Sequence, residues 1–286
     1  NGDTVQNPDA IINSVGDNGQ AANVPNALQQ EVQITNEAEL MKLISKEALQ
    51  TTEGMEQLNK SLFAILKEQM LMKPENMDSK EYVKELITKY WFLTDEILDS
   101  NIYYSLEGYL APETYFFDNK DVSVKEIINT LLKQEEKVLE KYKDKISDNP
   151  HYYITMASIV ELEGTNSENM KTIASVFENR LKSRMNLGSD VTTYYGLQVA
   201  MTSDLTSEQF ASVNAYNTRS TSMIGKMPIG PISNPSIEAL DASINHESSD
   251  YYYFVADKHG KVYFTKTLTE HNQKVAEIKK NGDWIW

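Results

Sequence analysis

The sequence predicts an α+β protein, with a helical N-terminal region followed by a mixed α+β domain that carries a C-terminal β-hairpin and helix. Three observations support this prediction. Apolar residues recur at intervals of three and four in several segments, which is typical of amphipathic helices. Ser or Thr followed three residues later by Glu marks several helix starts. Near the C-terminus, two short strand-like runs flank a turn that contains glycine.

The N-terminal residues 1–30 differ in composition from the rest of the chain. They are rich in Asn, Gln, Gly, Ala and Asp and contain few large apolar side chains. Such a segment cannot bury enough apolar surface to offset the entropy lost on ordering, so we predict a flexible tail or linker. The whole chain of 286 residues is long enough for one large domain or two modest ones.

Residues 31–100 are predicted to be a mainly helical region. A first helix should end at Pro74, because proline lacks a backbone donor and clashes with the preceding turn. A second should begin at Ser79, whose side chain suits an N-cap. The apolar residues at helical spacing are Leu62, Phe63, Ile65, Leu66 and Met70 in the first helix, and Val83, Leu86, Ile87 and Tyr90 in the second.

Residues 101–286 contain the predicted mixed α+β domain. Helix starts are predicted at Ser123 with Glu126, at Asn149 with Pro150, at Thr165 with Glu168 and at Thr267 with Glu270. The helix that begins at Pro150 is apolar on nearly all sides, so we expect it to be buried. Gly164 should end it in the left-handed conformation that glycine adopts without strain. The predicted strands of the hairpin are residues 251–256 and 261–265.

Two glutamates, Glu161 and Glu163, stand at the end of this apolar helix. An ionised carboxylate in an apolar setting is costly unless it is paired or protonated. Residues two apart on a helix differ by roughly 200° around the axis, so the two side chains should face opposite sides. We expect one to point toward the interior or a cleft and the other toward solvent. The simpler alternative is that both are structural or surface residues at a helix end.

The composition argues against several classes of function. Lys and Arg number 27 against 42 Asp and Glu, and the net charge of −15 without a basic cluster makes nucleic acid an unexpected partner. The absence of cysteine excludes disulfides, thiolate metal sites and a Cys nucleophile. The four histidines lack metal-ligand spacing, and the sequence has no P-loop, GxGxxG or GxSxG motif. We therefore expect no metal and no cofactor, which leaves carboxylate acid–base chemistry.

Five sequence blocks in a fixed order suggest a family. They read YSLEGYLAPETYFF (104–117), MASIVELEG (156–164), SVFENRLKSRMNLGSDVTTYYG (175–196), AYNTRSTSMIGKMPIGPISNPS (215–236) and YYYFVADKHGKVYFTKTLTEHN (251–272). In content and order these blocks resemble the YceG-like family, also called MltG, of bacterial endolytic murein transglycosylases. The resemblance implies that residues 101–286 form a catalytic domain.

The resemblance implies that Glu161 is the catalytic residue, because it matches the first Glu of the family block ASIVEKET. Glu163 matches the second Glu of that block. This chain reads ELEG instead of EKET, and LGSDVTTYYG where the family usually has LQTDPTxxYG. Leu162 and Gly164 thus replace a Lys and a Thr, and Gly188 and Val191 replace a Gln and a Pro.

The same resemblance suggests residues that shape the site. The predicted substrate-binding residues are Asp190, Tyr216, Asn217, Glu270, His271 and Asn272. Amide and imidazole groups can hydrogen-bond sugar hydroxyls and N-acetyl groups. Asn217 and Thr218 could instead satisfy the backbone of their own loop, and both alternatives stay open. The run PIGPISNP at residues 228–235 is expected to be a rigid loop beside the site.

The family's reaction breaks the MurNAc–GlcNAc glycosidic bond without water and leaves a 1,6-anhydro end. One carboxyl can serve both steps, so Glu161 would first donate a proton and then remove one from the C6 hydroxyl. A glycoside hydrolase on the same scaffold is one alternative; it would need a second carboxylate, for which Asp190 is the candidate. The other alternative is a non-catalytic cell-wall-binding or division-complex protein.

The resemblance also implies partners and a location. Peptidoglycan glycan strands are the expected substrate, and cell-wall synthesis or division proteins are further candidate partners. Family members work at the outer face of the bacterial membrane and carry an N-terminal membrane anchor. This sequence has no apolar stretch approaching the ~18 residues that a spanning helix needs. We therefore expect the anchor upstream of Asn1.

Overall fold

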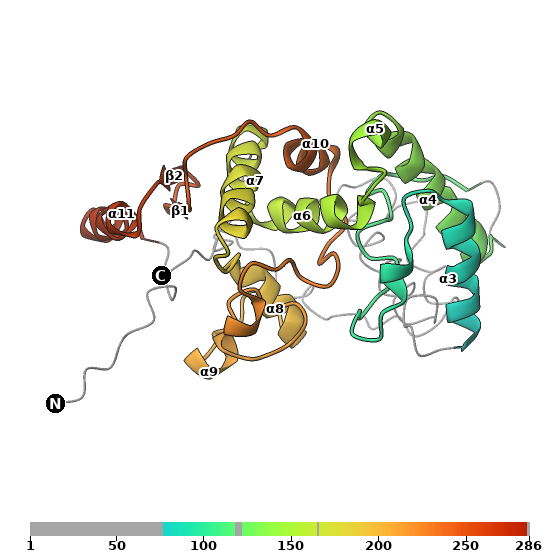
Figure 1. Ribbon diagram of the computed structural model, residues 1–286, viewed down its shortest axis with the longest axis horizontal. Helices are drawn as coiled ribbons and strands as arrows, with labels where there is room; N and C mark the ends of the chain where they lie inside the picture. Colours follow the sequence, from blue (N-terminus) through green and yellow to red (C-terminus); the bar gives the residue numbers. More distant parts are fainter. Residues whose placement is uncertain (1–76, 118–121, 165, 285–286) are drawn as a thin grey trace, which may run out of the picture. The chain divides into compact units, whose positions relative to one another are not determined.

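A computed structural model describes residues 77–117, 122–164 and 166–284 (Figure 1). The described part of the chain divides into two compact units. The smaller contains residues 77–89 and 97–106, and the larger contains residues 90–96 and those from Glu107 onward. The predicted tail at residues 1–30 and the helix predicted to end at Pro74 lie outside the described residues. Among the helices that are described, none combines the length and apolarity needed to cross a bilayer.

Helix α3 (Met77–Lys89) is the main element of the smaller unit. Val83 and Leu86 are buried, three residues apart and therefore on one face of the helix. Ser79 lies inside the helix, so the prediction that it forms the N-cap is wrong. The helical backbone already includes Met77, and a serine is tolerated within a first turn. The short 3-10 helix η2 (Asp95–Leu98) follows in the chain.

The first helices of the larger unit are α4 (Val124–Glu140) and α5 (Lys143–Ile146). Ser123 caps α4 as predicted, because its side chain accepts a hydrogen bond from the backbone N–H of Glu126 at 3.2 Å. One face of α4 is buried, with Ile127, Ile128, Leu131, Leu132, Glu135, Val138 and Leu139. The helix start predicted at Ser123 is therefore confirmed.

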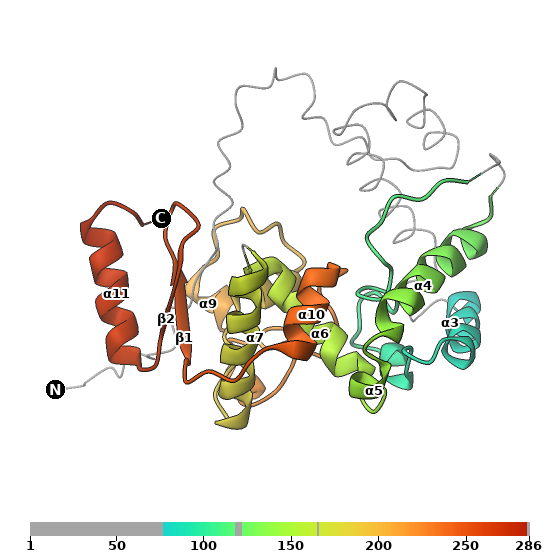
Figure 2. The same cartoon turned by 90° about the horizontal axis from the view of Figure 1, so that it is seen from above.

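Helix α6 (Pro150–Glu163) is the centre of the larger unit. Asn149 accepts a hydrogen bond from the backbone N–H of Tyr152 at 3.2 Å, so the predicted N-cap is confirmed. Residues 154–160 are all buried. Helices α7 (Ser167–Lys182) and α10 (Ile237–Asn245) pack on α6 and on each other (Figure 2). The buried helix predicted from the sequence is thus confirmed.

The turn between α6 and α7 differs from the prediction. Gly164 has φ −87° and ψ 140°, an extended conformation rather than the left-handed one. Glycine is needed there because the Cβ atom of any other residue would clash with Met170, at 2.3 Å from its Cγ. The N-cap of α7 is Asn166, whose side chain accepts from the Asn169 N–H at 2.9 Å, so the cap predicted at Thr165 is wrong. Asn caps as well as Thr, and the start shifts by one residue.

Three short helices lie between α7 and α10: α8 (Asp190–Leu197), α9 (Ser207–Phe210) and η3 (Thr221–Met223). Of these, α8 packs against both α6 and α9. The chain between them runs in irregular loops. Side-chain hydrogen bonds, described below, therefore position this part of the molecule.

Strands β1 (Tyr253–Ala256) and β2 (Val262–Thr265) form an antiparallel hairpin, and α11 (Leu268–Lys280) follows it. The paired residues are Tyr253 with Thr265, Phe254 with Phe264, Val255 with Tyr263 and Ala256 with Val262. Helix α11 begins with the predicted capping box of Thr267 and Glu270 and packs on both strands (Figure 2). The shared apolar cluster is Val255, Val275 and Ile278. The predicted α+β class, with its C-terminal hairpin and helix, is confirmed.

Residues 107–111 are buried without forming a helix or strand. Gly108 has a φ of +91°, and a Cβ atom there would lie 2.3 Å from Cβ of Pro231. The backbone N–H groups of Gly108 and Leu110 both donate to Oδ1 of Asn234, at 2.7 and 3.3 Å. Gly108 therefore lets this segment approach the loop that leads into α10.

Replacing Gly108 with Ala should destabilise the protein more than replacing Gly260 with Ala. Both glycines have positive φ, but a Cβ atom at Gly260 would meet nothing within 4 Å. The left-handed backbone costs a non-glycine residue about 1–2 kcal/mol at either position, and the clash with Pro231 is added only at Gly108. We expect thermal unfolding followed by circular dichroism to give a clearly lower Tm for Gly108→Ala. Equal Tm values would contradict the close packing at Gly108.

Candidate active site

Glu161 lies in the last turn of α6 and is partly exposed. Its Oε2 accepts two hydrogen bonds from Ser236, one from the backbone N–H at 2.9 Å and one from Oγ at 2.6 Å. Ser236 is the N-cap of α10, and its Oγ also accepts from the N–H of Ala239 at 3.2 Å. The carboxyl group is therefore held at the N-terminal end of a helix, where negative charge is favoured.

The loop before α10 runs along one face of α6. Nε2 of His151 bonds the carbonyl oxygen of Ile229 at 2.7 Å. Further along the helix, Oγ of Ser158 accepts from the N–H of Ile232 at 3.0 Å, and its carbonyl oxygen accepts from Oγ of Ser233 at 2.9 Å. Together with the bonds between Ser236 and Glu161, these contacts attach the loop to α6 at three positions along the helix. The rigid loop expected at residues 228–235 is thus fixed by named contacts.

His151 helps to attach the loop to α6 and is not available as a free base. Burial lowers its pKa, so the ring is neutral at pH 7. Its Nε2 must carry the proton, because the carbonyl oxygen of Ile229 can only accept. Nδ1 then accepts from the hydroxyl of Tyr109 at 2.6 Å. Both ring nitrogens are therefore used in holding the loop.

Glu163 points to the opposite side of α6, as helical geometry predicts. Its side chain is 2% exposed, and its Oε1 accepts a hydrogen bond from Oγ of Ser189 at 2.6 Å. Burial raises its pKa to about 8, with a further contribution from the charge of Asp190, while the Ser189 bond acts in the other direction. Glu163 is therefore largely protonated at pH 7, and its burial excludes direct contact with a large substrate.

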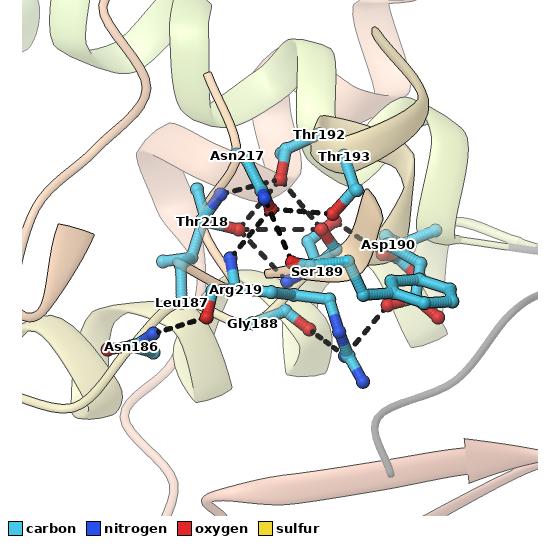
Figure 3. Close-up of polar contacts among 12 residues, drawn as sticks. Asn186, Leu187, Gly188, Ser189, Asp190, Thr192, Thr193, Asn217, Thr218 and Arg219 are labelled. Carbon is cyan, nitrogen blue, oxygen red and sulfur yellow. Dashed lines mark hydrogen bonds and ion pairs between the residues drawn. The ribbon is translucent and has the colours of Figure 1, made fainter. Parts of the chain in front are cut away.

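Asp190, at the start of α8, forms an ion pair with Arg219 at 2.7 Å between Oδ1 and Nη1 (Figure 3). Both side chains are only 9% exposed. Burial raises the pKa of Asp190 to about 6 even though the guanidinium acts to lower it. The guanidinium also donates to the carbonyl oxygen of Gly188 at 3.2 Å and lies over the ring of Phe210. Asp190 is thus engaged by a buried cation.

Hydroxyl and amide groups tie the segment 217–219 to the segment 188–193 (Figure 3). The Oγ1 atoms of Thr192 and Thr218 lie 2.8 Å apart, and the N–H of Ser189 donates to Oγ1 of Thr218 at 3.1 Å. Oγ1 of Thr193 donates to Oδ1 of Asn217 at 2.7 Å. These contacts hold the Asp190–Arg219 pair in place from both sides.

The structure places Tyr216 and Asn217 inside the protein. Asn217 is fully buried, and its Nδ2 donates to the carbonyl oxygens of Phe210 and Ser212 at 3.0 and 2.7 Å. This favours the alternative in which Asn217 satisfies loop backbone. Tyr216 is 1% exposed and packs against the ring of Tyr195. Both residues therefore pack inside the protein, and a direct contact of either residue with substrate stays a prediction.

The structure does not bring Glu270, His271 and Asn272 together with Glu161. All three lie on α11, and α7 lies between α11 and α6 in both views (Figures 1 and 2). The Glu270 carboxylate accepts from the N–H groups of Lys266 and Thr267 in the helix cap, which lowers its pKa. His271 is fully buried and Asn272 is exposed. A role for these three in binding substrate stays a prediction.

No sequence pattern predicted Ser236, Ser158 or Arg219 as site residues. Ser236 had a local signal, because it precedes an apolar helical repeat and is a good N-cap residue. Its contact with Glu161 joins positions 75 residues apart, so no local pattern reveals it. The same holds for Arg219, whose partner Asp190 lies in a different block.

Comparison with known proteins identifies the family of this chain. The model of the YceG-like family matches residues 10–277. The chain belongs to the YceG-like family. It is 35% identical over 230 residues to an endolytic murein transglycosylase of Bacillus subtilis (strain 168), covering 78% of this chain and 62% of the relative. It is also 33% identical over 212 residues to an endolytic murein transglycosylase of Streptococcus pneumoniae (strain D39), covering 70% of this chain and 38% of the relative.

A crystal structure of a YceG-like protein from Listeria monocytogenes is also similar, with a TM-score of 0.66 and 37% identity. It covers 76% of this chain, which in turn covers 72% of the Listeria chain. This YceG-like chain spans 62% and 38% of the lengths of the Bacillus and Streptococcus relatives, which is less than two thirds of each. Within it, Glu163, Ser189, Asp190 and Arg219 come from three separate sequence blocks and meet at the end of α6.

Replacing Glu163 with Gln should change the pH dependence of stability. Between the ordinary Glu pKa of 4.5 and about 8, the folded protein keeps a proton that the unfolded chain has lost. The contribution of Glu163 to the free energy of unfolding therefore falls as pH rises through this range, by up to about 1.4 kcal/mol per pH unit. Gln cannot titrate, so Glu163→Gln should gain stability relative to the wild type from pH 5 to pH 8.

Denaturant unfolding at pH 5 and pH 8 measures this difference. Glu135 on α4 gives an independent comparison, because it is 2% exposed and burial raises its pKa to about 8. Glu135→Gln should show the same trend without touching the end of α6. A constant difference between Glu163→Gln and the wild type would contradict a protonated Glu163.

Proposed function

We propose that this chain carries the catalytic site of an endolytic murein transglycosylase that cleaves peptidoglycan glycan strands, with Glu161 as its acid and base. The family and the names of the relatives support this substrate. The observation that carries the assignment to Glu161 is exposure. Of the three carboxyl-bearing residues at this end of α6, Glu163 and Asp190 are 2% and 6% exposed when the whole residue is counted, while Glu161 is partly open to solvent.

In the proposed reaction, Glu161 first gives its proton to the leaving oxygen as the bond from C1 of MurNAc to that oxygen breaks. The C6 hydroxyl of the same sugar then attacks C1, and the Glu161 carboxylate takes the hydroxyl proton. A 1,6-anhydroMurNAc end forms, no water is consumed and Glu161 regains its proton. The two hydrogen bonds from Ser236 and the end of α10 favour the carboxylate that exists between the steps. Since both bonds go to Oε2, Oε1 can serve the proton transfers.

A hydrolase would need a second carboxylate that activates water or attacks the sugar. Asp190 is the candidate from the sequence, but it is buried and paired with Arg219 at 2.7 Å. Burial keeps this carboxyl group away from a large substrate, and the ion pair with Arg219 holds it in place. The arrangement therefore favours the single-carboxyl reaction over hydrolysis.

The proposed substrate sets the proposed location. Peptidoglycan strands lie outside the bacterial membrane, so we place the protein at the extracytoplasmic face of the cell envelope, held there by an N-terminal membrane anchor. Cell-wall synthesis or division proteins are the proposed protein partners, because strand cleavage has to be coordinated with strand synthesis.

Glu161→Gln should abolish the release of anhydro ends from purified peptidoglycan. The substitution keeps the shape of the side chain and removes the transferable proton, and general acid–base catalysis contributes about 10²–10⁴-fold. Glu163→Gln is the matched control, two residues away on the same helix. It should retain most of the activity, because Gln resembles the neutral acid that is buried there.

Mass spectrometry of the digests distinguishes the outcomes. Anhydro-muropeptides from the wild type and from Glu163→Gln, but not from Glu161→Gln, support the proposal. Products with reducing ends would support the hydrolase. Binding of strands without any cleavage would support a wall-binding protein.

Ser236→Ala should slow cleavage about tenfold, because a hydrogen bond to a charged group contributes about 1.5 kcal/mol. The substitution also removes the N-cap of α10, so Ser123→Ala, which removes the N-cap of α4, is the control. Each should lower stability by about 1 kcal/mol. Initial rates of strand cleavage should fall only for Ser236→Ala, and an equal loss in both variants would assign the effect to stability.

A further inference from the structure

Glu107 and Tyr195 form a second carboxyl-containing pair in the larger unit. The hydroxyl of Tyr195, on α8, donates to Oε2 of Glu107 across 88 positions in the sequence. Glu107 is 4% exposed, whereas Tyr195 is partly exposed. The ring of Tyr195 also packs edge-on against Tyr216, with ring centroids 4.8 Å apart. The tyrosine is thus fixed at its hydroxyl and on one side of its ring, and part of its surface remains open to solvent.

Two chains of contacts join this pair to the end of α6. The first passes from Glu107 to its neighbour Gly108, whose N–H donates to Asn234, two residues before Ser236 and therefore next to the partner of Glu161. The second passes along α8 from Tyr195 to its N-cap Ser189, which donates to Glu163. These contacts connect Tyr195 to the C-terminal turn of α6, and both Tyr195 and Glu161 are partly exposed.

We propose that Tyr195 contacts the glycan strand beside Glu161, and that Glu107 is the positioning residue that holds its hydroxyl. The inference rests on the proposed function and adds a binding residue to it. No sequence pattern predicted a role for Glu107 or Tyr195.

The chemistry of the pair suits a sugar. An aromatic ring presents a rigid apolar face to the C–H groups of a pyranose at low conformational cost. A buried carboxyl oxygen that accepts the phenol hydrogen bond fixes the ring in one orientation, because rotation of the ring would leave this buried acceptor without its donor. The gain would be in binding the strand, in both ground state and transition state, so it should appear mainly in KM.

A matched pair elsewhere separates this role from a general effect on folding. The hydroxyl of Tyr152 on α6 donates to Oε1 of Glu178 on α7 at 2.5 Å, and this tyrosine is also partly exposed. Tyr152 lies in the first turn of α6, at the opposite end of the helix from Glu161. Tyr152→Phe therefore removes the same kind of hydrogen bond outside the two chains of contacts that join Tyr195 to the end of α6.

The first experiment compares steady-state cleavage of purified, uncross-linked glycan strands by the wild type, Tyr195→Phe and Tyr152→Phe, well below each Tm. We expect Tyr195→Phe to raise KM about tenfold with kcat within threefold, and Tyr152→Phe to stay within twofold in both constants. Glu107→Gln keeps an acceptor for the phenol and should stay within threefold of the wild type, whereas Glu107→Leu should match Tyr195→Phe. Values for Tyr195→Phe within twofold of those for Tyr152→Phe would overturn the inference.

Binding provides a readout that does not depend on turnover. In the Glu161→Gln background, co-sedimentation with purified insoluble peptidoglycan should show an apparent Kd about tenfold weaker when Tyr195→Phe is added, but not when Tyr152→Phe is added. An unchanged Kd would overturn the inference even if the wild type were inactive. An active wild type with unaffected Tyr195→Phe would reject the inference alone, whereas an inactive wild type whose binding depends on Tyr195 would reject the proposed reaction alone.

Discussion

The burial of α6 is the constraint on which the rest of the site depends. A helix that is apolar on nearly all sides leaves two carboxyl groups at its end to be accommodated, and an unpaired buried charge is too costly to persist. The two glutamates meet this constraint in different ways. Glu161 stays at the surface and receives both hydrogen bonds from Ser236, while Glu163 is buried, keeps its proton near pH 7 and bonds Ser189. Because Ser236 caps α10 and Ser189 precedes α8, satisfying the carboxyls also positions both helices.

Side-chain hydrogen bonds, rather than a central sheet, position the segments around α6. The described strands form only the C-terminal hairpin, so the irregular segments around α6 are held by hydroxyl, amide and imidazole groups bonded to backbone. His151 and Ser158 fix the loop before α10, and Asn217 and Thr218 fix the segment that carries Arg219. Each of these groups is buried and bonded more than once. A carboxyl held by such a network needs little reorganisation when charge develops beside it, which is the basis of electrostatic preorganisation.

The helices and the opposed glutamates could be predicted because they depend on local periodicity. The 3.6-residue repeat, the caps at Ser123, Asn149 and Thr267 and the 200° separation of Glu161 and Glu163 are all properties of short segments. The contacts that define the site are not local. The Ser236–Glu161 bonds span 75 residues and depend on how α10 packs on α6. Sequence also could not decide whether a polar residue such as Asn217 turns outward to a sugar or inward to its own loop.

Of the carboxyl groups at the end of α6, Glu161 is partly exposed, whereas Glu163 and Asp190 are buried. Asp190 is engaged by Arg219, and Glu163 lies close enough for the Asp190 charge to raise its pKa. If Glu163 ionised, two buried carboxylates would compete for a single guanidinium, and the start of α8 would lose stability. Its proton therefore keeps the supporting side of the site neutral overall. Glu161, on the other side of the helix, accepts both hydrogen bonds from Ser236. In the proposed reaction its charge would therefore change without disturbing that support.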